Sequence, residues 1–395
     1  MFETTRRAFL ASTAASAAQI HGANDRIRAA VVGAGGRGTL HIETFKELGA
    51  EVAAVCDVYE PNLARGVKAA SPGAKPYTDH RALLEDKSID AIVVATPDHW
   101  HAPIAIDAVT AGKDVYIEKP LAHTIEEGFR IIDAVRRTKR IAQIGVQRRS
   151  SELFEQGREL ARSGALGEIR LVNSQWLNFQ TSLRSGELKG KLDWNRWLGS
   201  APKKPLDPTR FLNWYYFWDY SGGLLIGQGA HIIDVIQWYM NSTFPTAVTC
   251  SATGPHVEGA EVPETASLAA EFPEGYLAVF TLGYRAMRYN WTNDHITQFH
   301  GTKARFDLGR ESYALWPASS AVDPKAAADV RRLGSFNLAT VAHVRNFLEC
   351  IRSRKEPNAP VEAGQYTNVA LCMAMESLRT GRRVRYNSAR RAMEV

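Results

Sequence analysis

The sequence has few features that would support a metal site, a disulfide framework or a membrane span. Its 395 residues include only four cysteines, Cys56, Cys250, Cys350 and Cys372. None of them forms a CxxC pair or has the spacing of zinc ligands. An oxidising compartment would permit disulfides, but the sequence does not pair the cysteines. Past the first two dozen residues, no run approaches the ~20 apolar residues of a transmembrane helix. We expect no metal and no stable membrane anchor.

The sequence also lacks a continuous stripe of one charge. The formal net charge is +6, but the basic residues are scattered, with short groups such as those at 136–140 and 382–385. No known nucleic-acid-binding module accompanies them, so we interpret them as solvated surface and expect no nucleic-acid partner. The 45% hydrophobic and 23% charged residues are ordinary globular values, and the length favours two domains.

Short apolar runs alternate with helical patterns between residues 25 and 148. The runs lie at 29–32, 52–56, 91–95, 115–117 and 141–144, and the helical patterns at 39–48, 101–111 and 125–137. Such runs, separated by helices, are typical of parallel strands covered on both faces. We predict an α/β domain with a doubly wound parallel sheet over this range.

From residue 149 to residue 395 the pattern changes. Alternating segments at 169–172, 266–272, 276–280, 295–300 and 305–308 predict antiparallel strands. Helical patterns interrupt them at about 230–240, 340–353 and 363–379. We predict an α+β domain with a large, mainly antiparallel sheet.

A glycine-rich motif follows the first predicted strand. Gly33-Ala34-Gly35-Gly36-Arg37-Gly38 fits G-x-G-x-x-G and opens a helix, and Asp57 ends the next strand 19 residues after Gly38. In that context the glycines let the backbone approach a pyrophosphate at the helix N-terminus. Asp57 would accept hydrogen bonds from the ribose 2′-hydroxyl and repel a 2′-phosphate. The motif therefore predicts a dinucleotide site with NAD favoured over NADP.

The first 24 residues have the pattern of an export signal. Arg6-Arg7-Ala8-Phe9-Leu10 opens an uncharged stretch to Ile20, with small residues at Ala15-Ser16-Ala17. The paired arginines predict the twin-arginine route and a periplasmic or exported protein. That route carries folded proteins, so a non-covalent dinucleotide has to be loaded before export. We therefore expect a tightly bound cofactor that is recycled in place.

The ends of the later strands carry polar segments, and ligands of open parallel sheets bind at such ends. The segments are Thr96-Pro97-Asp98-His99-Trp100-His101, Glu118-Lys119-Pro120 and Gln147-Arg148-Arg149. They resemble the T-P-[ND]-x-x-H, E-K-P and G-x-Q elements of the Gfo/Idh/MocA family of sugar-directed oxidoreductases, in order and spacing. Gly229-Ala230-His231-Ile232-Ile233-Asp234 is similar to the family's H-x-x-D segment. The resemblance covers about residues 26–386.

The resemblance implies an open-faced second sheet that carries the substrate and often an oligomer interface. It also implies hydride transfer between a nicotinamide and a hydroxyl-bearing carbon of a sugar, cyclitol or glycoside. We therefore expect a carbohydrate substrate and a homo-oligomer, either a dimer or a tetramer.

Two residues are candidates for proton transfer, which hydride removal from an alcohol requires. Lys119 can stabilise an alkoxide or relay its proton. His231 is a candidate acid/base, and Asp234, three residues on, could orient its imidazole. We expect His99 and His101 to shape the nicotinamide pocket.

The predicted cofactor-binding residues are Gly33, Gly35, Gly36, Arg37, Gly38, Asp57, Thr96, Pro97, Asp98, His99, Trp100, His101, Glu118, Lys119 and Gln147. The predicted substrate-binding residues are Lys119, Arg148, Trp176, Tyr216, Asp219, Gln228, His231 and Asp234. Tyr216 and Asp219 belong to an aromatic-rich run, 211–220, whose rings would suit sugar faces or, alternatively, a core or subunit interface.

One position departs from the family pattern. Many dehydrogenases of the family carry a carboxylate four residues before the histidine, and here that residue is Gly227. An alternative to alcohol oxidation is therefore a redox-neutral glycosidase or epimerase. Oxidation of C3 to a ketone would acidify the C2 proton, permit elimination at C1, and precede water addition and re-reduction. A third hypothesis, a non-catalytic NAD and sugar sensor, is disfavoured by the export signal and by Lys119 and His231.

Overall fold

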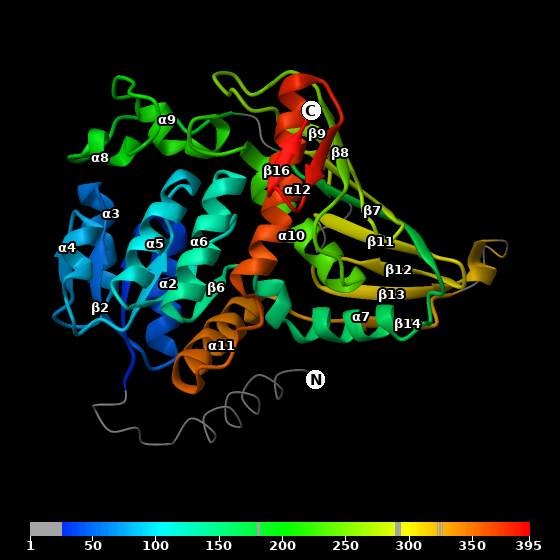
Figure 1. The fold of residues 1–395 in the computed structure, drawn as a ribbon, viewed down its shortest axis with the longest axis horizontal. Coiled ribbons are helices and arrows are strands. Elements are labelled where there is room, and N and C mark those ends of the chain that lie inside the picture. The colour runs from blue at the N-terminus through cyan, green and yellow to red at the C-terminus, as the bar shows by residue number, and fades with distance from the viewer. Residues whose placement is uncertain (1–25, 180–181, 289–293, 322, 324, 326) are drawn as a thin grey trace.

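A computed structural model describes residues 26–179, 182–288, 294–321, 323, 325 and 327–395. The predicted export signal, residues 1–24, lies outside this range. Two bodies of secondary structure lie beside each other, each built on one sheet (Figure 1). All four cysteines are free. Of the helices described, none is long and apolar enough to cross a membrane.

The first body is a six-stranded sheet in the order β3-β2-β1-β4-β5-β6, and every neighbouring pair is parallel. This confirms the predicted doubly wound sheet. Its strands are β1 (Arg28–Val32), β2 (Glu51–Cys56), β3 (Lys75–Tyr77), β4 (Ala91–Val94), β5 (Asp114–Ile117) and β6 (Ala142–Ile144). Its helices are α2 (Gly36–Glu47), α3 (Glu60–Ala69), α4 (His80–Leu84), α5 (His101–Thr110) and α6 (Ile125–Thr138).

Both faces of this sheet are buried, which explains its unbroken apolar runs. In β1, Val32 packs in a core cluster with α5 and α6, whereas Val31 packs in a second cluster with α2. That second cluster includes Phe347 of α11 (Ala339–Ser353), whose ring lies 5.7 Å from the Tyr116 ring. The chain therefore returns, about 200 residues later, to cover the first sheet.

The second body is a ten-stranded sheet in the order β14-β13-β12-β11-β7-β10-β9-β8-β15-β16. Only the β7–β10 pair is parallel among the described pairs, which confirms the mainly antiparallel prediction. Its strands are β7 (Ile169–Leu177), β8 (Ala247–Ala252), β9 (Thr265–Glu271), β10 (Leu277–Gly283), β11 (His295–Gly301), β12 (Ala304–Leu308), β13 (Ser312–Pro317), β14 (Val330–Leu333), β15 (Val384–Asn387) and β16 (Ala392–Glu394).

Helix α10 (Gly223–Met240) contains the predicted site residues Gln228, His231 and Asp234. It begins seven residues earlier than the sequence suggested. Its first turns contain Gly227 and Gly229. Each glycine disfavours a helix by about 1 kcal/mol, so the sequence did not predict the first two turns. Burial of Leu224, Leu225 and Ile226 outweighs that cost. A Cβ at Gly229 would lie 2.7 Å from Leu371 of α12 (Val361–Thr380), so this glycine permits close helix packing. Helix α7 (Glu152–Arg162) was not predicted.

A segment between β7 and α10 leaves the second body and lies over the first sheet at its strand ends (Figure 1). We call residues 182–222 the cap; it contains α8 (Trp194–Leu198), α9 (Pro208–Leu212) and the short helix η4 (Trp214–Tyr216). Backbone bonds fasten it beside Asp57: Glu60 N–H donates to Lys191 O at 2.9 Å and Asp193 N–H donates to Val58 O at 3.0 Å. These bonds tie the cap to the loop after β2.

Candidate functional site

A cavity of about 670 Å³ lies between the strand ends of the first sheet and the cap. The predicted residues that line it are Gly33, Gly35, Gly36, Arg37, Asp57, Thr96, Pro97 and Trp100. A Cβ added at Gly35 or Gly36 would meet none of the described atoms within 4 Å, so the backbone there faces open space. Gly35 is the N-cap of α2 and supplies no capping side chain, which leaves the first amides of the helix for a ligand.

The other two glycines of the motif shape the turn. Gly33 has a φ of +88°, and a Cβ there would lie 2.6 Å from Ala95 O. A Cβ at Gly38 would lie 1.8 Å from Gly33 O. Gly38 therefore acts through close helix–strand packing instead of lining the cavity.

Asp57 is held in the cavity wall by two backbone donors. Ala34 N–H donates to Oδ2 at 2.7 Å and Tyr59 N–H donates to Oδ1 at 2.8 Å. Burial raises the pKa of Asp57, although these bonds oppose the shift. Each carboxylate oxygen keeps acceptor capacity, as the predicted contact with a ribose hydroxyl requires. Arg65 is occupied: its Nη2 donates to Ala34 O and Asn62 Oδ1.

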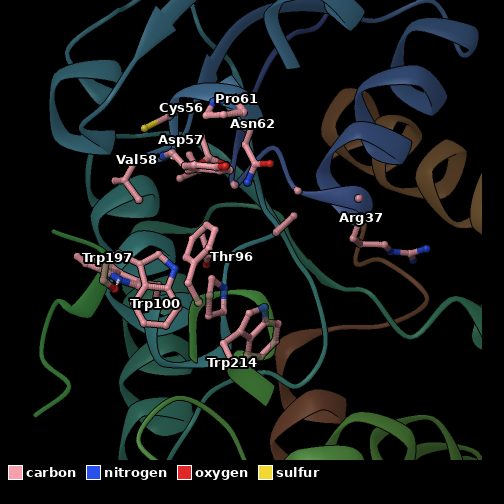
Figure 2. Close-up of a pocket in the computed structure, with 18 of the residues that line it drawn as sticks. Arg37, Cys56, Asp57, Val58, Pro61, Asn62, Thr96, Trp100, Trp197 and Trp214 are labelled. Carbon is pink, nitrogen blue, oxygen red and sulfur yellow. Dashed lines mark hydrogen bonds between the residues drawn. The ribbon is translucent and has the colours of Figure 1, made fainter. Parts of the chain in front are cut away.

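The cap closes the opposite side of the cavity. Figure 2 shows Trp100 and Trp197 next to each other, with Asp57 and Asn62 on the other side of the pocket. Trp197 O accepts hydrogen bonds from Trp100 Nε1 at 2.7 Å and from His99 Nε2 at 3.1 Å. Burial lowers the pKa of His99 to about 4, so its imidazole is neutral and anchors the cap.

Glu118, at the end of β5, is buried and bound on one oxygen by two side chains. Its Oε1 accepts from Arg37 Nε and contacts His41 Nε2, both at 2.7 Å. Burial alone would raise the pKa of Glu118, but Arg37, His41 and Lys119 hold it well below its usual range. The Arg37 side chain is thus committed to Glu118, and Figure 2 shows it turned away from the pocket centre.

Lys119 connects the two bodies. Its Nζ donates to Gly227 O at 3.0 Å, one helical turn before His231 on α10. A Cβ at residue 227 would lie 3.9 Å from Nζ, in a space the glycine leaves open. Burial lowers the pKa of Lys119, while Glu118 and Asp98 partly oppose that shift. The ammonium of Lys119 therefore releases its proton more easily than a surface lysine.

His231 lies on the same helix face and is neutral. Burial, and then the cations Lys119 and Arg148, lower the pKa of its imidazole well below the usual value. Its Nδ1 is buried and has no hydrogen-bond partner in the described part of the chain. The sequence suggested Asp234 as the residue that orients His231, and the structure places Asp234 elsewhere. Asp234 accepts from Arg149 Nε on both oxygens, at 2.9 and 3.0 Å, because that buried carboxylate needs a counter-charge.

A second cavity, of about 320 Å³, is lined by residues of β7 and α10 and of the segment that follows β6. The predicted residues Gln147, Arg148, Trp176, Gln228 and His231 line it together. Gln228 Nε2 donates to Tyr284 Oη at 2.7 Å. The cavity is therefore lined by five of the predicted residues, which come from three elements of the chain, η3 (Gln147–Ser150), β7 and α10.

Several predicted residues line neither of these two cavities. Tyr216 is fully buried in the second body's core. Asp219 pairs with Lys204 at 2.5 Å and with Arg210 at 3.4 Å. The buried Asp98 accepts from Ser221 Oγ at 2.5 Å. His101 has its two ring nitrogens on Pro120 O and Thr96 O, at 2.7 and 3.0 Å. Asp98 therefore joins a strand end to the cap, His101 joins two strand ends to each other, and Asp219 forms ion pairs within the cap.

Sequence reasoning missed two groups of lining residues. The cap supplies Arg184, Lys189, Arg196 and Trp197 to the first cavity, and Asn178, Tyr284, Arg288, Asp294 and Arg310 line the second. The first group lies in a stretch of the sequence without regular periodicity. The second group lies next to the ends of strands, where the alternation of side chains predicts which residues are buried but not which strands are neighbours in the sheet.

Comparisons with known proteins agree with this geometry. Residues 27–146 match the family model described as "Oxidoreductase family, NAD-binding Rossmann fold" of Gfo/Idh/MocA. Residues 158–386 match the companion model described as its C-terminal alpha/beta domain. Together the two matches cover most of the chain.

Curated relatives match parts of the chain. An alpha-N-acetylgalactosaminidase of Shewanella oneidensis is 35% identical over 158 residues, which are 36% of this chain and 33% of the relative. Inositol 2-dehydrogenase 2 of Saccharopolyspora erythraea is 29% identical over 250 residues, or 62% of this chain and 63% of that enzyme. The alignments thus span between one third and two thirds of these relatives.

A solved structure shares the whole architecture. The WlbA dehydrogenase of Bordetella pertussis, in complex with NADH and UDP-GlcNAcA, superposes with a TM-score of 0.70 at 20% identity. The match covers 92% of this chain and 99% of that one. At that identity the likeness shows the fold.

The first cavity fits an NAD molecule on its own geometry. The open space over Gly35 and Gly36, the uncapped α2 amides and the acceptor capacity of Asp57 correspond to the pyrophosphate and ribose positions. The cap supplies Arg184, Lys189, Arg196 and Trp197 to the lining of this cavity.

We predict that loosening the cap speeds NAD release. Gly199 has a φ of +55°, and a Cβ there would lie 2.5 Å from the Trp100 ring, so Gly199→Ala pushes the cap off Trp100. We expect NAD to dissociate at least about tenfold faster, since about 1.4 kcal/mol of lost contact suffices. The measurement is NAD remaining in denatured protein after gel filtration.

Gly186→Ala is the matched control, because Gly186 also has positive φ (+142°) but its Cβ would meet no described atom within 4 Å. Equal NAD release from both variants and the parent protein would contradict a retaining role for the cap.

Proposed function

Because the chain belongs to the Gfo/Idh/MocA oxidoreductase family with its NAD-binding Rossmann fold, we propose that it is an NAD-dependent oxidoreductase acting on a hydroxyl group of a sugar or glycoside. The observation that carries this proposal is the position of Lys119. Its neighbour Glu118 binds Arg37 of the cofactor cavity, and its own Nζ binds Gly227, adjacent to Gln228 of the second cavity. Lys119 lines neither cavity, but these two bonds connect the Glu118-Lys119 pair to a lining residue of the first cavity and to the neighbour of a lining residue of the second.

The chain's own residues supply the proton transfer. Bound NAD would accept the hydride from the hydroxyl-bearing carbon. Lys119 in its neutral form accepts the hydroxyl proton, and burial increases the neutral fraction by lowering its pKa. A neutral imidazole has one nitrogen that can accept a hydrogen bond, and we assign that role in His231 to orienting the substrate hydroxyl.

We propose that NAD stays bound through turnover and is recycled in place. The cap supports this, because its backbone bonds to the loop after Asp57 and the bonds of Trp197 O to His99 and Trp100 hold it over one side of the cofactor cavity. A resident cofactor requires a second substrate that returns the hydride, or a reaction with no net redox change.

The redox-neutral alternative is a glycosidase or epimerase that works through a 3-keto intermediate. C3 loses a hydride to NAD and its hydroxyl loses a proton, C2 loses a proton, and the C1 substituent leaves with the electron pair and takes up a proton. Water then adds, with its hydroxyl at C1 and a proton at C2, and the hydride returns to C3 while a proton returns to its oxygen. The absence of a carboxylate at Gly227 and the likeness of part of the chain to a glycosidase favour this second candidate.

One incubation separates the two candidates. Purified protein with its own NAD and no added cofactor is given a panel of glycosides. Net oxidation predicts reduced nicotinamide in amounts no greater than the enzyme, or exchange between sugars. The glycosidase predicts many equivalents of free sugar.

Lys119→Ala should lower either turnover by about 10² to 10⁴, the usual contribution of a positioned acid/base, with NAD still bound. Lys68→Ala, on the exposed face of α3, is the matched control. Unchanged turnover in the Lys119 variant would refute its role as the base.

The pH dependence follows from the lowered pKa of Lys119. Below that pKa the lysine is charged and cannot accept a proton, so oxidation rises as pH rises through it. Gly227→Asp places a carboxylate beside Nζ and favours the ammonium, which should move the rising limb upward by about one pH unit or more. Gly227→Asn, of equal size and neutral, should leave the limb in place. If the two variants have the same pH–rate profile, Lys119 is not the group whose titration controls the rate.

We further propose export by the twin-arginine route and assembly as a dimer or tetramer. The support is the Arg6-Arg7 pattern and, for assembly, the exposed Leu171 and Leu277 on paired strands of the second sheet. Replacing both arginines by lysine should keep the protein in the cytoplasm, and normal secretion would refute the route. A monomeric mass in solution would refute the assembly.

A further inference from the structure

The second cavity contains an excess of positive charge. Three arginines line it, Arg148, Arg288 and Arg310, with Asp294 as the one carboxylate among the lining residues described. Such a charge balance is unusual for a site that receives only neutral hydroxyl groups.

Arg148 is the least compensated of these cations. Its side chain is 2% exposed, and its Nε has no hydrogen-bond partner among the described residues. The guanidinium carbon lies 5.3 Å from the Phe154 ring centre, 5.4 Å from Trp176 and 5.8 Å from Phe336. Burial, and then Arg310, lower the pKa of Arg148 to about 9, although the charges of Asp294 and Asp234 partly oppose the shift without a hydrogen bond to it. Aromatic faces hold the guanidinium in place, but they do not replace a counter-ion.

The nearby carboxylates are committed to other groups. Asp294 bonds His295 Nδ1 at 2.9 Å and Arg310 Nη2 at 3.1 Å. Asp234 is bound by Arg149. A buried arginine is stable when a carboxylate or another oxyanion meets its fork of donors. The missing partner of Arg148 is therefore expected from outside the chain.

We propose that the second cavity binds an oxyanion of the substrate through Arg148, so that the substrate is an acidic sugar or its glycoside, with a carboxylate as the matching group. A carboxylate fits the planar guanidinium in a bidentate way, and a sulfate ester shares that chemistry. Gln228 and Tyr284, already joined by a hydrogen bond, remain to meet sugar hydroxyl groups. The sugar part of this inference rests on the proposed function.

The test compares matched substrates on the intact protein with its bound NAD. A hexuronic acid glycoside, the corresponding neutral hexoside and its 6-sulfate ester are assayed for product. We expect the KM of the uronide to be at least about tenfold below that of the neutral hexoside. If only the sulfate ester is preferred over the neutral hexoside, the cavity binds an oxyanion, but the proposal that this oxyanion is a carboxylate is wrong.

Arg148→Met keeps an apolar stem between the rings and removes the charge. It should raise the KM of the uronide on the order of 10²-fold, the usual loss from a buried charged partner, and leave the neutral hexoside within a factor of a few. Arg170→Met, on the exposed side of β7, is the control and should change neither substrate. Equal loss for both substrates would overturn the inference, because it indicates a structural role.

Equal KM values for acidic and neutral glycosides in the parent protein would overturn the inference and leave the proposed function standing. If no glycoside reacts, the proposed function fails, and binding is measured instead by calorimetry with free glucuronate and free glucose. Binding of glucuronate that exceeds that of glucose and is lost in Arg148→Met would support the site; equal binding would overturn it.

Discussion

The hydrogen bond from Lys119 Nζ to Gly227 O links the end of β5 to helix α10, and the placement of both cavities depends on it. On one side, Glu118 holds Arg37 and His41 and so fixes the turn that leads into α2. On the other side, Gln228 and His231 follow Gly227 on the helix and face the second cavity. The bond therefore connects the dinucleotide-binding sheet to the remaining polar groups of the site.

The cap imposes a second constraint, because it covers one side of the cofactor cavity and supplies Trp197 to its lining. An ordinary dinucleotide-binding sheet presents its strand ends to solvent, and the cofactor exchanges freely. Here the cap bonds along the loop after Asp57 and places Trp197 over Trp100. If NAD stays bound as proposed, the chemistry is limited to cycles that return the hydride, which is why the redox-neutral alternative accompanies simple oxidation.

The sequence predicted those parts of the structure that periodicity and local motifs encode. Buried parallel strands appear as apolar runs, so β1, β2 and β4 were recognised, and the glycine motif with Asp57 led to the cofactor cavity. The start of α10 was missed because its glycines weaken the helical pattern that tertiary packing restores. Asp234 was assigned to His231 by spacing alone, whereas the counter-charge of Arg149, 85 residues away in the chain, decides its partner. Contacts of this range leave no local pattern.

Gly227 and Arg148 both affect the pKa of His231: residue 227 supplies no negative charge, and Arg148 supplies a positive one. Burial lowers the pKa of His231 most, the cations Lys119, Arg148 and Arg37 lower it further, and Glu118 partly opposes them. No carboxylate at residue 227 offsets Lys119, so in the free protein the imidazole is a weak base. An oxyanion that neutralises Arg148 removes one of the three cationic influences and raises the pKa of His231. Lys119, whose pKa is set first by burial and then by Glu118 and Asp98, is affected less. An acidic substrate would thus increase the basicity of the imidazole that faces its hydroxyl, which a neutral sugar in the same cavity would not do.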